Sequence, residues 1–187
     1  MLHDIANAET TAEHTFHLAL LVWLAGEKKN DIDTERAMKM ALVHDMCEAY
    51  APDFTSYDAA GLDENKELTK KDLKNIRPKK GRPTTAQREK LGKLKKELEQ
   101  EAMEKITKGL GKNLKEEILD LWNDYEEGIS TESRFVKQAD RMINLLQGLD
   151  YYKRYGKIEY ELWVRRAKEV IDDEHLVALL KEIEKDI

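Results

Sequence analysis

A proline-free stretch from residue 131 to residue 155 repeats apolar side chains every three or four positions. This spacing places the repeated side chains on one face of an α-helix, where they can be buried together. Ser130 and Thr131 precede the stretch and carry the side-chain oxygens that cap helix N-termini. We therefore predict one long helix with an inward stripe of Phe135, Ala139, Met142, Leu146 and Leu149.

Helical spacing of apolar residues continues through most of the remaining chain. Only 9 glycines and 3 prolines are present, and 41% hydrophobic with 37% charged residues suits amphipathic helices with solvated outer faces. An all-α bundle is predicted, with further helices at about 12–25, 34–50, 83–109, 114–127, 159–171 and 174–185. The inward faces of the first two should hold His14, Leu18, Leu21 and Ala25, and Met38, Ala41, Leu42 and His44, respectively.

Residues 54–82 interrupt this pattern. They are polar and charged, and the run from Lys70 to Arg82 contains Pro78 but few apolar residues. We expect a loop or excursion here, with its charged character extending to about residue 96. A length of 187 residues suits one hydrophobic core. We therefore expect a single domain over 1–187 that carries this excursion.

Composition excludes several classes of protein. The net charge of -6 argues against a general nucleic-acid binder. The longest apolar run, residues 18–25, is far shorter than the roughly 20 residues of a membrane span. No secretory leader is recognisable, and Cys47 is the only cysteine, so no internal disulfide can form. We expect a cytoplasmic protein that binds neither nucleic acid nor membranes.

The dipeptide His44-Asp45 is the part of the sequence that most clearly indicates a metal site. It follows apolar helical residues, and an ionised carboxylate in such surroundings needs a partner that offsets its desolvation. Imidazole nitrogens and carboxylate oxygens are good ligands of divalent metals. His14, on the apolar face of the first helix, and Asp140, beside the stripe of the long helix, are the best further candidates.

In these residues the sequence resembles the HD-domain superfamily of metal-dependent phosphohydrolases, and within it the branch of 5'-deoxynucleotidases. The resemblance covers most of the chain, and its blocks occur in the family's order. They are Glu9-Thr-Thr-Ala-Glu-His14, Ala41-Leu-Val-His44-Asp45-Met-Cys-Glu48, Asp53, Leu121-Trp122 through Tyr125-Glu126, and Phe135-Val-Lys-Gln-Ala-Asp140.

The resemblance implies an enzyme of nucleotide metabolism with one divalent ion. His14, His44, Asp45 and Asp140 would be its ligands; Mn, Co, Mg, Zn, Ni and Fe are all acceptable to such a set. Glu48 would lie near the attacking water, and Asp53 would also lie in the site. The substrate would be a deoxynucleoside 5'-monophosphate, and the family implies a homodimer, which aromatic residues around Trp122, Tyr151 and Trp163 would suit. Separately, a position four residues after His44 on a continuous helix would bring Glu48 onto the same face.

Two departures from the family pattern leave other substrates open. The Arg-Trp or Gly-Trp element that contributes to the family's substrate pocket would fall before Met1. The basic segment from Lys70 to Lys96 is longer than in close relatives and could contact phosphate. An HD-domain hydrolase of a nucleoside triphosphate or cyclic nucleotide is therefore one alternative, and a non-catalytic helical regulatory module is another.

Each candidate also has a purely structural interpretation. His14 could be a core histidine, His44-Asp45 a helix cap, and Asp140 a partner of Arg141 or Lys137. Glu48 could be an ordinary helix residue, and Asp53 a turn residue beside Pro52. We also expect Cys47 to be a buried thiol, and Trp122 and Tyr125 to belong to the core or to a dimer contact. His17 should pack near the first helix, although His3 and His17 could reach the site.

Overall fold

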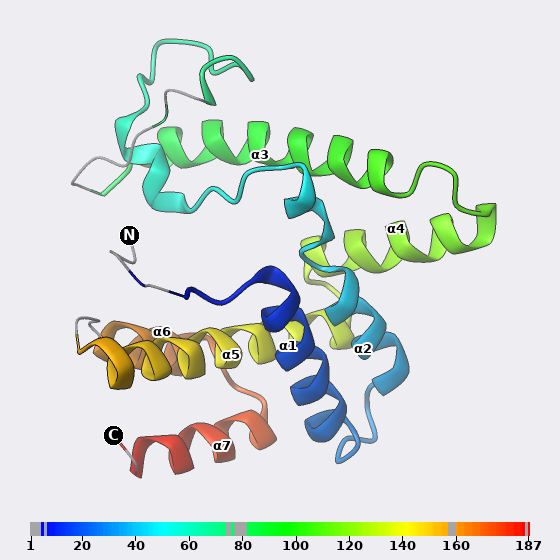
Figure 1. The fold of residues 1–187 in the computed structure, drawn as a ribbon, viewed down its shortest axis with the longest axis vertical. Helices are drawn as coiled ribbons and strands as arrows, with labels where there is room; N and C mark the ends of the chain where they lie inside the picture. Colours follow the sequence, from blue (N-terminus) through cyan, green and yellow to red (C-terminus); the bar gives the residue numbers. More distant parts are fainter. Residues whose placement is uncertain (1–4, 6, 74–75, 77–81, 157–159, 186) are drawn as a thin grey trace. The chain divides into compact units, whose positions relative to one another are not determined.

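The computed structural model describes residues 5, 7–73, 76, 82–156, 160–185 and 187 (Figure 1). Within these residues every regular element is helical, as the sequence predicts. The α-helices are α1 (Thr11–Gly26), α2 (Thr34–Val43), α3 (Thr85–Ile106), α4 (Lys112–Glu127), α5 (Thr131–Tyr155), α6 (Tyr160–Val170) and α7 (Glu174–Lys185). Two 3₁₀ helices, η1 (Met46–Ala49) and η2 (Ser56–Gly61), lie between α2 and α3. No helix in the described ranges is long and apolar enough to cross a membrane.

The chain forms two compact units. The first unit comprises residues 1–45 and 116–187, and the second unit comprises residues 46–115. The first unit is therefore built from two segments that are distant in sequence. That the two units together make one domain over 1–187, with the excursion at about 54–96, stays a prediction.

Helix α5 organises the first unit. Helices α1, α2, α6 and α7 all contact it, and α1 also contacts α2 along its length (Figure 1). Leu18 and Met142, both predicted to face inward, are fully buried in this core, together with Val22, Met40 and Val136, which were not predicted. Burial of a large aliphatic side chain stabilises the fold by about 1.5–3 kcal/mol, so this contact set holds α1 and α2 against α5.

Local side-chain chemistry fixes where these helices begin. Thr10 caps α1 in a reciprocal arrangement with Glu13, whose carboxylate accepts from the Thr10 backbone N–H at 2.8 Å. Asp33 and Ser130 cap α2 and α5 by accepting from the backbone N–H groups of Arg36 and Ser133. Each such cap is worth about 0.5–2 kcal/mol. Because Thr10 fixes the first turn of α1, it also fixes the position of His14 one turn later.

Two glycines shape α5: Gly156 ends the helix, and Gly148 allows α6 to pack closely against it. Gly156 adopts φ +65°, a left-handed conformation, and its N–H donates to Tyr152 O at 2.8 Å, which ends the helix. Gly148 faces Trp163 of α6 so closely that a Cβ atom at residue 148 would lie 3.1 Å from the indole. The absence of a side chain at Gly148 therefore sets the approach of these two helices.

The second unit is organised by α3, which contacts both η1 and η2. Thr84 caps α3, and Gln87 donates to Leu62 O at 2.7 Å. The Lys90 ammonium donates to the backbone carbonyls of Asp63, Glu64 and Lys66 at 2.6–2.9 Å. These contacts tie the loop after η2 to α3. Residues 74–75 and 77–81 of the predicted excursion, including Pro78, lie outside the described residues.

Two sequence predictions about these helices are wrong. The second helix does not continue to residue 50: α2 ends at Val43, and the chain turns at residues 44–45 before the tighter helix η1. Short polar side chains such as that of Asp45 compete with helical hydrogen bonding, which favours an end at this point. Leu42 and Leu146, both predicted to face inward, are exposed, while their neighbours Val43 and Leu145 are buried instead.

Candidate metal centre

The first unit brings His14, His44 and Asp140 together. One ligand atom from each lies within 4.8 Å of the other two, although the residues come from α1, the end of α2 and α5. Nε2 of His14 is 3.1 Å from Oδ1 of Asp140. Helical spacing accounts for this arrangement, since His14 and Asp140 each occupy the edge of an apolar face that packs into the core.

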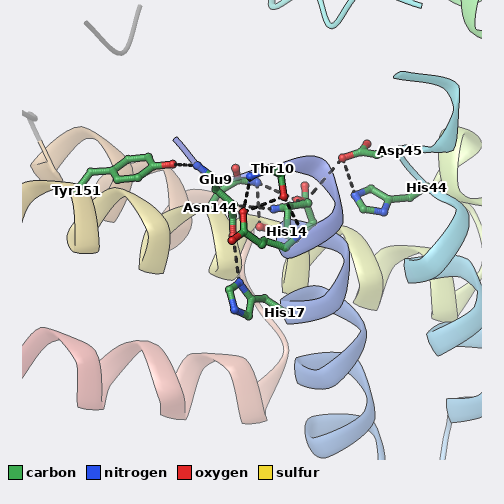
Figure 2. A network of polar contacts seen from close by, with 10 residues as sticks. Glu9, Thr10, His14, His17, His44, Asp45, Asn144 and Tyr151 are labelled. Carbon is green, nitrogen blue, oxygen red and sulfur yellow. Dashed lines mark hydrogen bonds and ion pairs between the residues drawn. The ribbon is translucent and has the colours of Figure 1, made fainter. Parts of the chain in front are cut away.

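Asp45 stands beside these three residues. Its Oδ2 atom lies 3.0 Å from Nε2 of His44 and 4.0 Å from Nε2 of His14 (Figure 2). His44 keeps helical backbone angles, φ −56° and ψ −42°, so the two side chains point about 100° apart, as on a helix, and meet beside its edge. In the turn, the imidazole and the neighbouring carboxylate both reach the same small region of the first unit.

Hydrogen bonding fixes the tautomer of His44. Its Nδ1 atom lies 2.8 Å from Ala41 O, a carbonyl in the last turn of α2 that lacks a helical partner. A carbonyl only accepts, so Nδ1 carries the proton and, in the neutral ring, Nε2 holds the free lone pair. Nε2 is buried and faces Asp45 Oδ2 at 3.0 Å; in this neutral tautomer both atoms present lone pairs, so no hydrogen bond joins them.

This arrangement fits a divalent metal ion. Ligand atoms about 2.0–2.2 Å from an ion lie about 3 Å apart when adjacent and about 4 Å apart when nearly opposite. The distances of 3.0, 3.1 and 4.0 Å among His44, Asp45, His14 and Asp140 match those values. Two neutral imidazoles and two carboxylates would also balance a charge of about +2. The contact of His44 Nε2 with Asp45 Oδ2 is the strongest of these observations, because a buried lone pair that faces a carboxylate is costly until a cation or a proton lies between them.

The same carboxylates shift the pKa of both imidazoles. Burial alone lowers the pKa of His14, but contact with Asp140 outweighs it and the net pKa is raised. For His44, burial likewise lowers the pKa and Asp45 raises it, with a net increase. Without a cation, the site therefore attracts a proton. A metal ion would replace that proton and interact with the same carboxylates.

Neighbouring side chains support the four residues. Asn144, one turn after Asp140 on α5, donates to Asp140 Oδ1 at 2.8 Å. The ring of Tyr125 contacts that of His44 edge to face, with centroids 5.1 Å apart. Burial, then Asp140 and Asp45, raise the pKa of Tyr125, so its phenol stays protonated. The sequence analysis assigned no role to Asn144, although its spacing of four from Asp140 is a signal that could have identified it.

The remaining candidates lie in different surroundings. Glu48 is in η1 of the second unit, so the argument from a continuous α-helix is wrong: the chain there has the tighter 3₁₀ spacing. Asp53, also in the second unit, is 60% exposed and lies 3.4 Å from the Lys95 ammonium. Cys47 is buried and forms no disulfide, as expected.

The other aromatic and histidine candidates divide between the core and the surface. Trp122 and Tyr125 are buried core residues, and Tyr151 is buried too, so their side chains do not form an exposed surface. His17 is 51% exposed and contacts Glu9. His3 lies outside the described residues.

Several curated proteins with similar sequences are named for the same activity. The 5'-deoxynucleotidase HDDC2 of Xenopus laevis is 28% identical over 83% of this chain and 63% of its own length. The protein of the same name from Dictyostelium discoideum is 28% identical over 86% of this chain and 72% of its own length. The 5'-deoxynucleotidase YGK1 of Saccharomyces cerevisiae is 25% identical over 92% of this chain and 67% of its own length. This chain thus spans a little under two thirds of the length of the Xenopus relative.

Solved structures share the fold. A conserved hypothetical protein from Pyrococcus furiosus superposes with a TM-score of 0.60 at 21% identity, over 96% of this chain and 85% of that protein. A protein from Magnetospirillum magnetotacticum, described as a predicted metal-dependent phosphohydrolase, gives a TM-score of 0.61 at 21% identity. The match covers 100% of this chain and 81% of that protein. The family model of the HD domain matches residues 1–91 and 82–179, nearly the whole chain. The chain belongs to the HD-domain family.

Proposed function

We propose that this chain is a metal-dependent phosphohydrolase that releases phosphate from deoxynucleoside 5'-monophosphates. The observation that carries the proposal is the convergence of His14, His44 and Asp140, with the Asp45 carboxylate facing the buried Nε2 of His44 at 3.0 Å. The relatives named 5'-deoxynucleotidases supply the substrate class.

The four residues of the candidate metal centre would hold one divalent ion, Mn, Co, Mg, Zn, Ni or Fe. An ion bound there would polarise a phosphoryl oxygen and lower the pKa of water. His44 is prepared for this role because Ala41 O keeps its proton on Nδ1. Asn144 holds the Asp140 carboxylate in place from the adjacent helical turn.

Glu48 is proposed as the residue that orients the attacking water and accepts its proton. The water oxygen would bond to phosphorus as the bond from phosphorus to the nucleoside 5'-oxygen breaks, and that oxygen would leave as a hydroxyl with the proton passed on by Glu48. A carboxylate that is ionised at the working pH can accept the proton, and transfer becomes easier as a bound ion lowers the pKa of the water. Asp53 is proposed as a second acidic residue of the site, with Lys95 as its neighbour in the second unit.

We also propose a cytoplasmic homodimer that acts on a small nucleotide and binds neither nucleic acid nor membranes. The reduced, buried Cys47 and the net charge of -6 support the compartment and the lack of nucleic-acid binding. Light scattering of the purified protein at several concentrations would test the dimer, since a constant mass of one chain would contradict it.

A phosphate-release assay, with the nucleotide products also separated by chromatography, tests the central proposal. The protein is stripped with a chelator, reloaded separately with each of the six metals, and offered deoxynucleoside and ribonucleoside 5'-monophosphates, nucleoside triphosphates and cyclic nucleotides. We expect the deoxynucleoside monophosphates to be hydrolysed fastest, and only after metal is restored. Preferential hydrolysis of a triphosphate or cyclic nucleotide would contradict the substrate assignment. Metal binding without hydrolysis of any of these would favour a regulatory module.

Glu48→Gln separates catalysis from metal binding in the same assay. It should retain bound metal at the wild-type ratio while turnover falls by about 10²–10⁴-fold, the usual contribution of general acid-base catalysis. Glu67→Gln, a change at an exposed residue of the same unit, is the matched control. Wild-type turnover in Glu48→Gln would remove Glu48 from the mechanism.

A further inference from the structure

The carboxylate of Glu9 lies between two imidazoles. Its Oε1 atom is 3.0 Å from Nδ1 of His17, and its Oε2 atom is 3.6 Å from Nδ1 of His14 (Figure 2). The Glu9 side chain is only 12% exposed. An acidic group this enclosed is desolvated, so it interacts strongly with the N–H groups around it.

The backbone of Glu9 is held from two sides. Its N–H donates to the hydroxyl of Tyr151, on α5, at 2.6 Å. The next residue, Thr10, is the cap of α1 and is locked by Glu13. Glu9 is therefore fixed by the same two helices that carry His14 and Asp140, and its carboxylate cannot move far from the His14 ring.

We infer that Glu9 is a positioning residue that keeps the proton of His14 on Nδ1 and turns Nε2 toward Asp140 and His44. This inference rests on the proposed function, because it gives Glu9 a role toward a proposed metal ligand. A neutral imidazole has one N–H and one lone pair, and a metal ligand must offer the lone pair. A carboxylate beside Nδ1 favours the proton there, because it attracts an N–H and repels a lone pair.

The two histidines would then be oriented by different means. His44 uses a backbone carbonyl, Ala41 O, at the end of α2. His14 is in the second turn of α1, where backbone carbonyls are already used by the helix, so an outside acceptor is needed. At 3.6 Å the contact from Glu9 is an ion-pair distance, longer than a hydrogen bond, and its orienting effect is electrostatic.

A purely structural role for Glu9 predicts a different result. In that case Glu9 would only hold the start of α1 through His17 and Tyr151, and its loss would lower stability without changing metal affinity. Glu13 supplies a control for this outcome, since its carboxylate also stabilises the start of α1 but contacts Thr10 rather than an imidazole. Glu13→Gln should therefore lower the melting temperature and leave metal affinity near that of the wild type.

The test measures Mn²⁺ and Zn²⁺ affinity by calorimetry for the full chain and for Glu9→Gln, Glu9→Ala and Glu13→Gln, each checked for folding by circular dichroism. We expect Glu9→Ala to bind about 10–100-fold more weakly, the usual effect of losing such a supporting group. Glu9→Gln should lie between Glu9→Ala and the wild type, because its amide oxygen still accepts but carries no charge. Its near-isosteric side chain keeps the test valid if Glu9→Ala does not fold.

Nitrogen-15 spectra of histidine-labelled, zinc-loaded protein provide the second measurement. The His14 ring should show protonated Nδ1 in the wild type and in Glu13→Gln, and a mixture of tautomers in the Glu9 variants. Folded Glu9 variants with wild-type affinity and an unchanged His14 tautomer would overturn the inference while leaving the proposed function intact. A wild-type chain that binds neither metal would overturn both.

Discussion

Nε2 of His14 and Oδ1 of Asp140 lie 3.1 Å apart, although one residue is on α1 and the other on α5. The packing of these two helices brings the atoms together, and Asn144 holds the carboxylate from the other side. The candidate metal centre is therefore a product of tertiary packing within the first unit. Its properties should respond both to changes in the ligands and to changes in the residues that support them.

Asp140→Asn should abolish stable metal binding. The amide removes one negative charge and one good ligand atom from the proposed set, leaving a weaker site. Elemental analysis after dialysis against metal-free buffer checks this, with Asp150→Asn as the control. Asp150 is on the same helix but pairs with Arg154, so its variant should retain the wild-type metal content. Equal metal content in both variants would contradict the assignment of Asp140.

Asn144→Ala should weaken metal binding without eliminating it. The change removes the hydrogen bond that orients Asp140 Oδ1, and the loss of such a supporting contact commonly costs about 10–100-fold in metal affinity. A titration with a competing fluorescent chelator measures the change. Asn144→Asp is a second variant for this test. Its new carboxylate would repel the Asp140 carboxylate when no metal is bound. Unchanged affinity in Asn144→Ala would show that Asp140 needs no support.

Asp173→Asn should destabilise the first unit at neutral pH and much less in acid. Burial raises the pKa of Asp173, but the Lys29 ammonium, 2.8 Å away, and the amides of α7 outweigh it and lower the pKa below 3.8. The stabilisation is thus present above pH 3.8 and is lost as pH falls through the folded pKa. We expect a cost of about 1–3 kcal/mol at neutral pH. Urea unfolding at neutral pH and below pH 3.8 measures it; an equal cost at both would contradict the prediction.

Gly148→Leu and Gly92→Ala should change stability in opposite directions. A side chain at residue 148 meets the Trp163 indole, and overpacking of this kind costs about 1–3 kcal/mol. A Cβ atom at residue 92 meets no described atom within 4 Å, so Gly92→Ala on α3 should gain about 0.5–1 kcal/mol from helix propensity. Thermal unfolding followed at 222 nm compares the two. A Gly148→Leu protein as stable as the wild type would show that α6 can shift without cost.

Helix positions could be predicted where the sequence contains its own boundary signals. The bounds of α5 follow from Ser130 at its start and from the apolar stripe, and α7 runs from 174 to 185 as predicted. The end of α2 carries only the weak signal of Asp45, since no glycine or proline separates Val43 from Ala51. There the chain turns at His44 and Asp45, and local propensity alone does not reveal it.

The candidate site shows the same limit. The chemistry of the histidines and aspartates could be predicted from residue type and from the resemblance to the HD-domain family. The support from Asn144 could have been predicted from its spacing, but that from Glu9 could not, because Glu9 meets Tyr151 across 142 positions of sequence. Such pairs depend on how the helices pack, which a single sequence does not specify. The roles of Glu48 and Asp53 stay predictions, and the assays above address Glu48 directly.

The division of the first unit into residues 1–45 and 116–187 has a consequence for biosynthesis. The ribosome makes His14, His44 and Asp45 well before Asp140, with all of the second unit in between. A nascent chain that ends before α5 thus lacks both a proposed ligand and the helix that aligns the others. Cation capture should therefore be a late event, completed only after α5 has been released and packed against α1.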